Sequence, residues 1–165
     1  YMNKSLSTRS LRVGIFEPRI PQNTGNIGRT CLAYNLPLDL IKPLGFSIED
    51  KYLKRAGLDY WKNIDLTLHE NFELYKTYNS NSRIIGFSKK DGIDLSHFKF
   101  TNDDCLLFGR EDTGLPQSIR DKCHTICTIP MPGIASNEDK KGVRSLNIAV
   151  ACGIAIFNAY LSCRD

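Results

Sequence analysis

The chain has 165 residues, of which 41% are hydrophobic and 24% are charged, with a formal net charge of +4 and a pI near 8.7. This length suits one domain that buries a hydrophobic core, and no run of about eighteen apolar residues could span a bilayer. The basic charge favours contact with a polyanion, but many proteins that bind no nucleic acid are equally basic. Residues 1–12 lack the apolar core of a secretory signal, so we expect no membrane association and a cytoplasmic location.

Apolar runs alternate with helix-like segments along the chain, which predicts an α/β protein with a mostly parallel sheet flanked by helices. The expected strands are Leu11–Phe16, Leu38–Ile41, Leu66–Leu68, Ile84–Phe87, Cys105–Phe108 and Thr125–Ile129. The expected helices are Thr24–Tyr34, Ile48–Arg55, Phe72–Tyr78, Pro116–Lys122 and a last one from Ser145 to about Ser162. No internal repeat is found, and Gly133–Gly142 is the only linker-like stretch. We therefore expect a single domain over residues 1–165, with residues 1–12 as a flexible extension and the linker-like stretch mobile.

The six cysteines lie mostly inside apolar segments, which favours reduced thiols that fill a core over disulfides. They are Cys31, Cys105, Cys123, Cys127, Cys152 and Cys163. Cys123, His124 and Cys127 are close in sequence, but no second Cys or His pair follows at a spacing that would close a tetrahedral site. We expect no metal.

The first segment that can carry chemistry is Glu17–Arg29, which leaves the first strand and opens a helix. Asn23 is the expected N-cap, and Gly25 and Gly28 allow a backbone or a ligand to come close. Free N–H groups at such a helix start favour an anion, so a phosphate could dock there. From this segment alone, a plain strand-to-helix turn with an exposed arginine is the better interpretation.

The second segment is Leu107–Pro116, where a strand runs into an acidic turn before a proline starts a helix. Gly109 and Gly114 allow close backbone approach, and Glu111 can accept hydrogen bonds from hydroxyls or amines. An ordinary turn with acidic residues near a helix start explains the same pattern about as well.

The third segment runs from Ile129 through Pro132 and the linker-like stretch to Gly142–Ala151. Ser145 is the expected N-cap, and the small apolar residues that follow predict a helix that packs very closely. A buried C-terminal helix is the simpler explanation, but it does not account for the polar residues at its head. These are Arg144, Ser145 and Asn147.

Taken in order, the three segments resemble the three signature motifs of the SPOUT RNA 2'-O-methyltransferases, in the TrmH-like branch. The TrmL group of that branch is the most similar, through residues 16–18 and 20–27, Pro43-Leu44-Gly45-Phe46 and Arg55-Ala56-Gly57-Leu58-Asp59-Tyr60. The likeness spans Val13 to Tyr160. It implies the SPOUT fold, in which the C-terminal part forms a deep trefoil knot, a rare exception to ordinary chain topology.

The same resemblance implies S-adenosylmethionine as the cofactor, bent in the knot and held mainly by backbone groups. The expected cofactor contacts are Phe87, Gly109, Ile129, Met131, Ser145 and Leu146, with Glu111 and Asn147 shaping the site. Arg29 is the implied catalytic residue, and Asn23, Asn26 and Arg29 are the implied substrate contacts. A protonated guanidinium suits orientation and electrostatic stabilisation better than proton abstraction. A structural salt bridge is the alternative role for Arg29.

Family members act as homodimers, and the Gly-, Ala- and Cys-rich face from Ala149 to Ala159 suits close packing between subunits. The implied substrate is tRNA, methylated on the ribose of wobble nucleotide 34, either C or a modified U, in the single-stranded anticodon loop. Phosphate contacts could come from basic residues that are otherwise solvated charges. They are Arg9, Arg12, Arg19, Lys51, Lys54 and Arg55.

The chain departs from the TrmL group in three places. The segment between Met131 and Arg144 is longer and more charged, Ala149 replaces a common serine, and Phe157 replaces a common tyrosine. The alternatives are an enzyme for another tRNA or rRNA site, and an inactive RNA-binding module that kept the fold. An inactive module has no need for the residues of methyl transfer, and this chain keeps Arg29, Asn23, Glu111, Ser145 and Asn147.

Overall fold

The computed structural model describes residues 11–57, 60–133 and 145–164. Within them, seven strands form one sheet in the order β3-β2-β1-β6-β4-β7-β5, and every paired strand is parallel. The strands are β1 (Arg12–Phe16), β2 (Leu38–Ile41), β3 (Leu66–His69), β4 (Ile84–Phe87), β5 (Ile93–Asp94), β6 (Cys105–Phe108) and β7 (Thr125–Thr128). The predicted parallel α/β sheet is confirmed.

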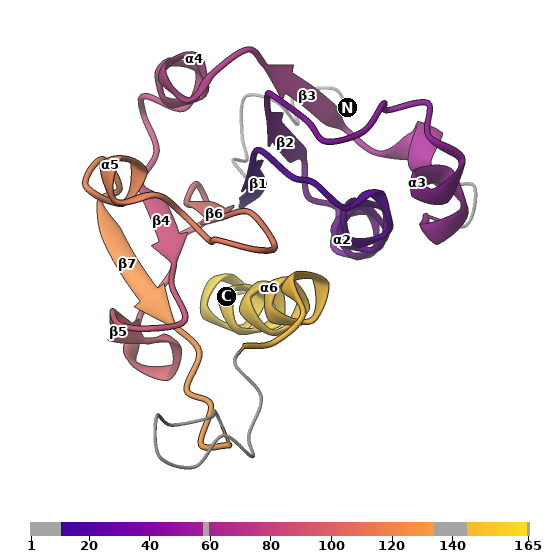
Figure 1. Cartoon of the computed structure of the whole chain (residues 1–165). Coiled ribbons are helices and arrows are strands. Elements are labelled where there is room, and N and C mark those ends of the chain that lie inside the picture. Colours follow the sequence, from indigo (N-terminus) through magenta and orange to yellow (C-terminus); the bar gives the residue numbers. More distant parts are fainter. Residues whose placement is uncertain (1–10, 58–59, 134–144, 165) are drawn as a thin grey trace, which may run out of the picture.

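Helices cover both faces of this sheet (Figure 1). They are α2 (Pro21–Ala33), α3 (Lys51–Ala56), α4 (Phe72–Tyr78), α5 (Gln117–Arg120) and α6 (Ile148–Cys163), with short 3-10 helices η1 (Trp61–Asn63) and η2 (Leu95–His97). Helices α2 and α6 lie on one face, and α4 and α5 lie on the other. Each face has its own hydrophobic cluster, with Ile27, Cys152 and Ile156 in the first and Phe72, Tyr75 and Ile119 in the second.

Two predicted N-caps were wrong. Helix α2 begins at Pro21 with Ile20 as its N-cap, because a proline is already set for the first helical position and needs no N–H donor there. Asn23 therefore lies inside the helix rather than capping it. Helix α6 begins after Asn147, whose side chain caps it, so Ser145 is not the N-cap.

Helix α6 buries its small side chains against the chain's own core. Cys152, Ala155 and Ala159 are fully buried, so the small-residue face is not available to a second subunit and that part of the dimer prediction was wrong. The exposed face instead carries large apolar side chains at helical spacing. They are Val150, Ile154, Phe157, Tyr160 and Leu161, each between 41% and 52% exposed.

A charged cluster lies beneath α4, on the face away from α6. Asp39 on β2 is fully buried and accepts hydrogen bonds from Arg12 Nε and Nη2 at 2.9 Å each, while His69 Nε2 lies 2.8 Å from its Oδ1. The Arg12 guanidinium also stacks on the Tyr78 ring, and its pKa is raised by the hydrogen bond and charge of Asp39, although desolvation opposes this. Arg12 is thus held inside the fold, and its predicted phosphate contact was wrong.

All six cysteines are free thiols, as predicted, and four of them are buried. His124 Nδ1 accepts a hydrogen bond from the Ile84 amide at 2.9 Å, so this ring has a structural partner. No group of three or more His, Cys, Asp or Glu side chains within the described ranges could hold a metal ion. Among the same residues, no helix is long and apolar enough to cross a membrane.

Several sequence predictions fall outside the described ranges. They concern Arg9 and most of the N-terminal extension, Leu58 and Asp59 of the internal signature, nearly all of the linker-like stretch, and Arg144.

Candidate functional site

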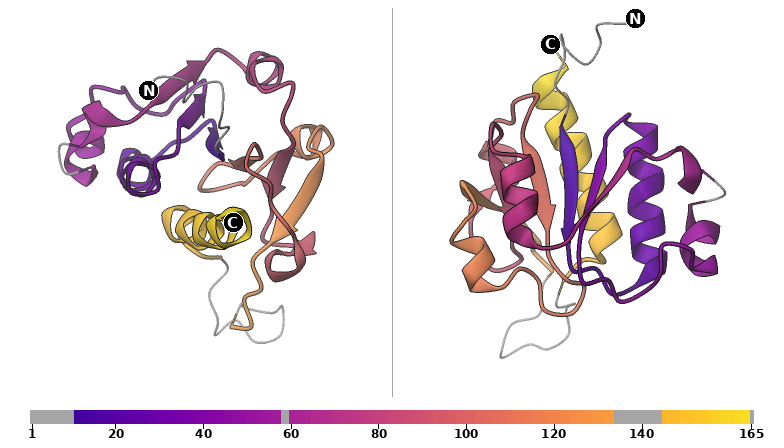
Figure 2. Two further views of the ribbon diagram at one scale, coloured as in Figure 1. Left: turned by 180° about the vertical axis from the view of Figure 1, so that it is seen from behind. Right: turned by 90° about the horizontal axis from the view of Figure 1, so that it is seen from above.

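A pocket lies at the carboxyl ends of β4, β6 and β7, where ligands bind in open α/β sheets. The loops that build it gather at one end of the molecule, beside the start of α6 (Figure 2). Seven of the eight predicted cofactor residues line it: Phe87, Gly109, Glu111, Ile129, Met131, Ser145 and Leu146. The eighth, Asn147, lies between two lining residues, Leu146 and Ile148, without lining the pocket itself. The structure therefore brings together residues that are up to 59 positions apart.

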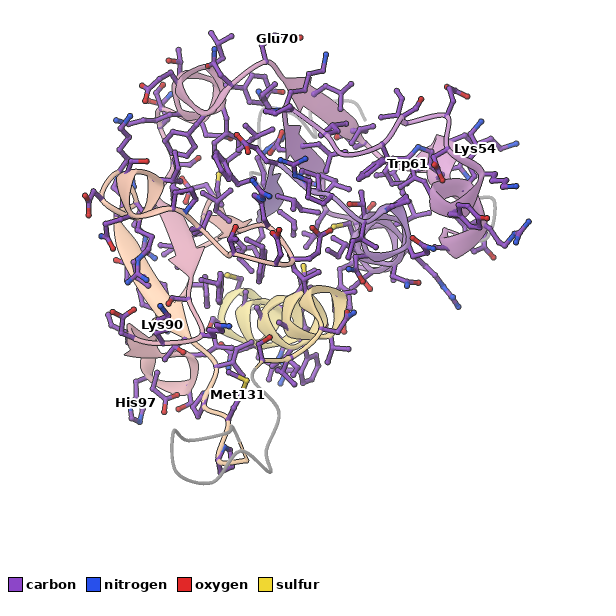
Figure 3. All side chains as sticks on the ribbon, viewed as in Figure 1. Lys54, Trp61, Glu70, Lys90, His97 and Met131 are labelled. Carbon is purple, nitrogen blue, oxygen red and sulfur yellow. The ribbon has the colours of Figure 1, made fainter. Side chains whose placement is uncertain are left out.

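The pocket has an apolar part and a charged rim. The rings of Phe87 and Phe108 stack at 4.5 Å with an angle of 7° between them, and both line the pocket. Lys89 and Lys90 follow β4 and are exposed at the rim. Figure 3 shows Met131 next to α6 and Lys90 on the side of β7. An apolar wall beside a charged rim suits a ligand with an aromatic base at one end and charged groups at the other.

The loop that follows β6 closes on itself. Arg110 and Gly114 exchange backbone hydrogen bonds of 3.2 and 2.8 Å, and Gly114 has a φ of +72°. A Cβ on Gly109 would lie 2.1 Å from the Gly114 carbonyl carbon, so only glycine fits there. The close approach predicted from these glycines is confirmed, and it is an approach of backbone to backbone.

Arg110 ties this loop to the end of β1. Its guanidinium lies 3.2 Å from Asp112 and 3.9 Å from Glu17, and the hydrogen bond to Asp112 lowers the pKa of that carboxyl. Glu17 has a φ of +50°, a left-handed conformation that is rare outside glycine. An unfavourable backbone conformation at this position indicates local strain beside the pocket.

Glu111 connects the loop to the beginning of α2. Its Oε1 accepts a hydrogen bond from the Arg19 amide and its Oε2 accepts one from the Ile20 amide, both at 2.9 Å. The sequence suggested that amides at this helix start could receive a phosphate. These two amides instead bind an anion from the protein itself, so that prediction was wrong for Arg19 and Ile20.

Asn147 connects the start of α6 to α2. Its Oδ1 accepts hydrogen bonds from the amides of Ala149 and Val150, at 2.8 and 3.3 Å, which makes it the N-cap of α6. Its Nδ2 donates to Asn23 Oδ1 at 3.0 Å. The three segments selected from the sequence therefore meet at the first turn of α2.

Arg29 and Asn26 lie on the exposed face of α2 and do not line the pocket. Arg29 makes no hydrogen bond or ion pair to any other residue in the described part of the chain. The salt bridge considered as its structural role is thus not formed within these residues.

Sequence reasoning left several pocket residues unassigned, among them Phe108 and Arg120. Phe108 ends a buried strand directly before Gly109, at the same edge of the sheet as Phe87, and that position was the available signal. Arg120 was missed because its partners come from another loop: Nη1 donates to Ser88 at 3.2 Å, and Nη2 pairs with Asp91. Its buried Nε has no hydrogen-bond partner among the described residues.

Comparison with known proteins places this geometry in a family. The sequence profile of the SpoU rRNA Methylase family matches residues 10–157. The tRNA (cytidine(34)-2'-O)-methyltransferase of Methylovorus glucosotrophus is 37% identical over 146 residues, which cover 88% of this chain and 91% of that protein.

Two solved structures share the fold. One, described as giving structural insights into the 2-OH methylation of C/U34 on tRNA, is 41% identical, with a TM-score of 0.85 over 93% of this chain and 96% of that chain. The AdoMet-bound rRNA methyltransferase of Sinorhizobium meliloti is 23% identical, with a TM-score of 0.80 over 94% of this chain and 57% of that chain. The chain belongs to the SpoU rRNA methylase family.

Proposed function

We propose that this protein transfers a methyl group from S-adenosylmethionine to the ribose 2'-hydroxyl of nucleotide 34, C or a modified U, in the anticodon loop of tRNA. The likeness to the C/U34 methylation structure carries the proposal, because it combines 41% identity with coverage of almost the whole of both chains. The named activity of the Methylovorus relative supports the same reaction and position. A cytoplasmic location is part of the proposal.

The pocket fits S-adenosylmethionine. The stacked Phe87 and Phe108 rings offer an apolar surface for an adenine, and the buried Nε of Arg120 offers a donor that no described residue uses. Backbone groups next to Gly109, Ile129 and Leu146 would hold the remaining polar atoms. The cofactor supplies the methyl group, and the chain's own residues bind and orient the two reactants.

The knot and the single domain belong to the same proposal. The loop after β6 and the segment before α6 line one pocket although more than thirty residues separate them, which is the arrangement that a C-terminal knot would create. One sheet carries both hydrophobic clusters, which supports a single domain.

Arg29 is proposed to bind an RNA phosphate and to orient the 2'-hydroxyl for in-line attack on the methyl group. Transfer between two held reactants depends mainly on alignment, so an orienting guanidinium is sufficient. Its exposure and its lack of a partner among the described residues support this role. Asn26, one turn earlier on the same helix, would contact the same part of the RNA.

We propose that the protein acts as a homodimer through the exposed apolar stripe of α6, whose centre is Phe157. A stripe of large apolar side chains on one helix marks an interaction surface. Helix α6 packs beside α2, so a second subunit would lie near Arg29 and the RNA surface would be shared. Phe157→Glu should convert a dimer into a monomer in sedimentation analysis, while Lys62→Glu, at an exposed position on η1, should not.

The reaction and its position are tested together by incubating the protein with methyl-labelled cofactor and total tRNA, then mapping the labelled nucleoside. We expect 2'-O-methylcytidine or a 2'-O-methylated uridine derivative at position 34. Label at another tRNA position or in rRNA only would replace the substrate assignment. Calorimetry with S-adenosylmethionine separates the inactive RNA-binding module, which would bind RNA without binding the cofactor.

A further inference from the structure

We infer that Glu111 and Asn147 are positioning residues that tie the first turn of α2 to two walls of the cofactor pocket, so that filling the pocket sets Arg29 in place for the RNA. The inference rests on the proposed function and assigns these two side chains to the protein's own α2. The resemblance had placed them with the cofactor.

Glu111 lines the pocket, but its side-chain hydrogen bonds run to the entry of α2. Each carboxylate oxygen accepts a hydrogen bond from one backbone amide of the two residues that precede the helix, Arg19 and Ile20. A carboxylate near a helix N-terminus is favoured by the helix dipole, and ionised acceptors make the stronger hydrogen bonds. Because both donors are backbone amides, they hold the course of the chain at the entry to α2.

Asn147 makes an equivalent connection from the other wall. Its side-chain oxygen caps α6, and its amide group donates to Asn23 in the first turn of α2. Asn147 therefore cannot turn toward the pocket without breaking its contact with one helix or the other. Leu146 and Ile148, its two neighbours in sequence, both line the pocket.

The two side chains that contact α2 belong to different segments of the pocket wall. Glu111 belongs to the loop after β6, and Asn147 belongs to the segment before α6. A ligand that contacts both segments fixes their separation, and so it fixes both attachment points of α2. Since α2 is one continuous helix from Pro21 to Ala33, its orientation at the first turn determines where Arg29 points.

This geometry makes binding of the cofactor and binding of the RNA mutually dependent. A bound cofactor holds α2 and Arg29 in the orientation that the RNA requires, and by linkage a bound RNA strengthens cofactor binding by the same factor. Typical coupling between two sites corresponds to about 5- to 150-fold in affinity, which an equilibrium measurement resolves.

The first test needs only the protein and S-adenosylhomocysteine as a non-reactive occupant of the pocket. Amide hydrogen exchange is followed in the peptide that covers residues 17–26, with and without this compound. In the wild type and in Glu70→Gln, the compound should slow exchange in this peptide. Glu70 is an exposed carboxylate at the far end of the molecule from Met131, so it matches the charge change (Figure 3).

In Glu111→Gln, we expect S-adenosylhomocysteine to bind with nearly the wild-type Kd, but the peptide should lose most of this protection. One amide loses its acceptor, because the Gln NH2 group is a donor, and the other amide keeps only a neutral acceptor. Equal protection in Glu111→Gln and the wild type would overturn the inference. So would a loss of affinity for S-adenosylhomocysteine large enough to explain the lost protection, since Glu111 would then act on the cofactor.

The second test uses tRNA. Asn147→Ser keeps an oxygen that can cap α6 but is too short to reach Asn23. Asn147→Ser and Asn23→Ala should each lower kcat about tenfold, and the double variant should lose no more than either single one. Losses in kcat that add up in the double variant would show that the two residues do not act through the contact between Asn147 and Asn23.

The two proposals fail in different ways. A wild-type protein that does not methylate tRNA would remove the proposed function, while the exchange measurement would still decide the role of Glu111. A wild type that methylates tRNA with no change in RNA affinity on adding S-adenosylhomocysteine would remove the inference alone.

Discussion

Two carboxylates in different parts of this fold have different kinds of hydrogen-bond partner. Asp39, beneath α4, is fully buried, and its partners are the side chains of Arg12 and His69. Glu111, beside the pocket, is partly exposed, and its partners are two backbone amides of another segment. The first carboxylate holds strands together inside the protein, whereas the second holds the entry to α2, the helix that carries Arg29.

Removing the buried carboxylate should have the largest effect. Asp39→Ala leaves a guanidinium and an imidazole without their acceptor in the interior, so we expect a loss of about 3–5 kcal/mol in the free energy of unfolding. Urea denaturation measures this loss, and the exposed Glu70→Ala should change stability by less than about 0.5 kcal/mol. A similar small change for Asp39→Ala would mean that the cluster is not a determinant of stability.

Removing Arg29 should lower the activity and leave the stability unchanged. Arg29→Ala takes away an exposed side chain, so the urea midpoint should remain the same, while kcat for tRNA methylation should fall by about 10²–10³-fold, as when one transition-state hydrogen-bond donor is lost. Lys62→Ala removes a positive charge from an exposed position on η1 and is the control. Methylation at the normal rate by Arg29→Ala would remove the catalytic assignment.

Two glycines of α2 sharpen the comparison within a single helix. A Cβ at Gly25 would lie 2.5 Å from the Leu53 carbonyl oxygen on α3, whereas a Cβ at Gly28 would meet the ends of the Trp61 and Ile64 side chains. Overpacking costs about 1–3 kcal/mol, and side chains can move aside more easily than backbone. Gly25→Ala should therefore destabilise the protein more than Gly28→Ala in urea titrations, and the reverse order would contradict this packing.

The smallest expected effect concerns two buried thiols, Cys105 and Cys127, which lie in the hydrophobic clusters on opposite faces of the sheet. Burial raises the pKa of Cys105 to about 12 and that of Cys127 to about 11, so both are protonated at neutral pH. Alkylation by iodoacetamide should be slow at pH 8 and should accelerate as the pH rises toward these values, because the thiolate is the reactive form. In guanidinium chloride, both should react as ordinary thiols. Fast labelling of either in the native protein would show that its side of the core opens.

The sequence predicted the elements better than it predicted the contacts between them. Strands Leu38–Ile41, Ile84–Phe87 and Cys105–Phe108 match their observed bounds. The last two are continuous apolar runs, as is usual for buried parallel strands, and Asp39 is the one charged residue within the first. The two-residue strand β5 was missed, since so short a pairing leaves no pattern in the sequence.

The pocket was predicted only through resemblance, since each of its segments was ambiguous by itself. The partners of Glu111 could not be predicted, because they lie 91 and 92 residues away and are backbone amides, which carry no residue signature. Arg12 was misread for a related reason. A basic residue near the N-terminus gives no sign that a buried carboxylate will take its charge.

The left-handed backbone at Glu17 has a consequence for anyone who wishes to engineer this enzyme. A non-glycine residue in that conformation costs about 1–3 kcal/mol, so Glu17→Gly is the substitution that a search for thermostability would select. Yet the Glu17 carboxylate lies beside Arg110, in the loop that shapes the pocket. A heat-resistant variant obtained in this way would be more stable, but the loop beside its cofactor pocket would be less well held. Stabilising substitutions near an active site often lower activity in this way.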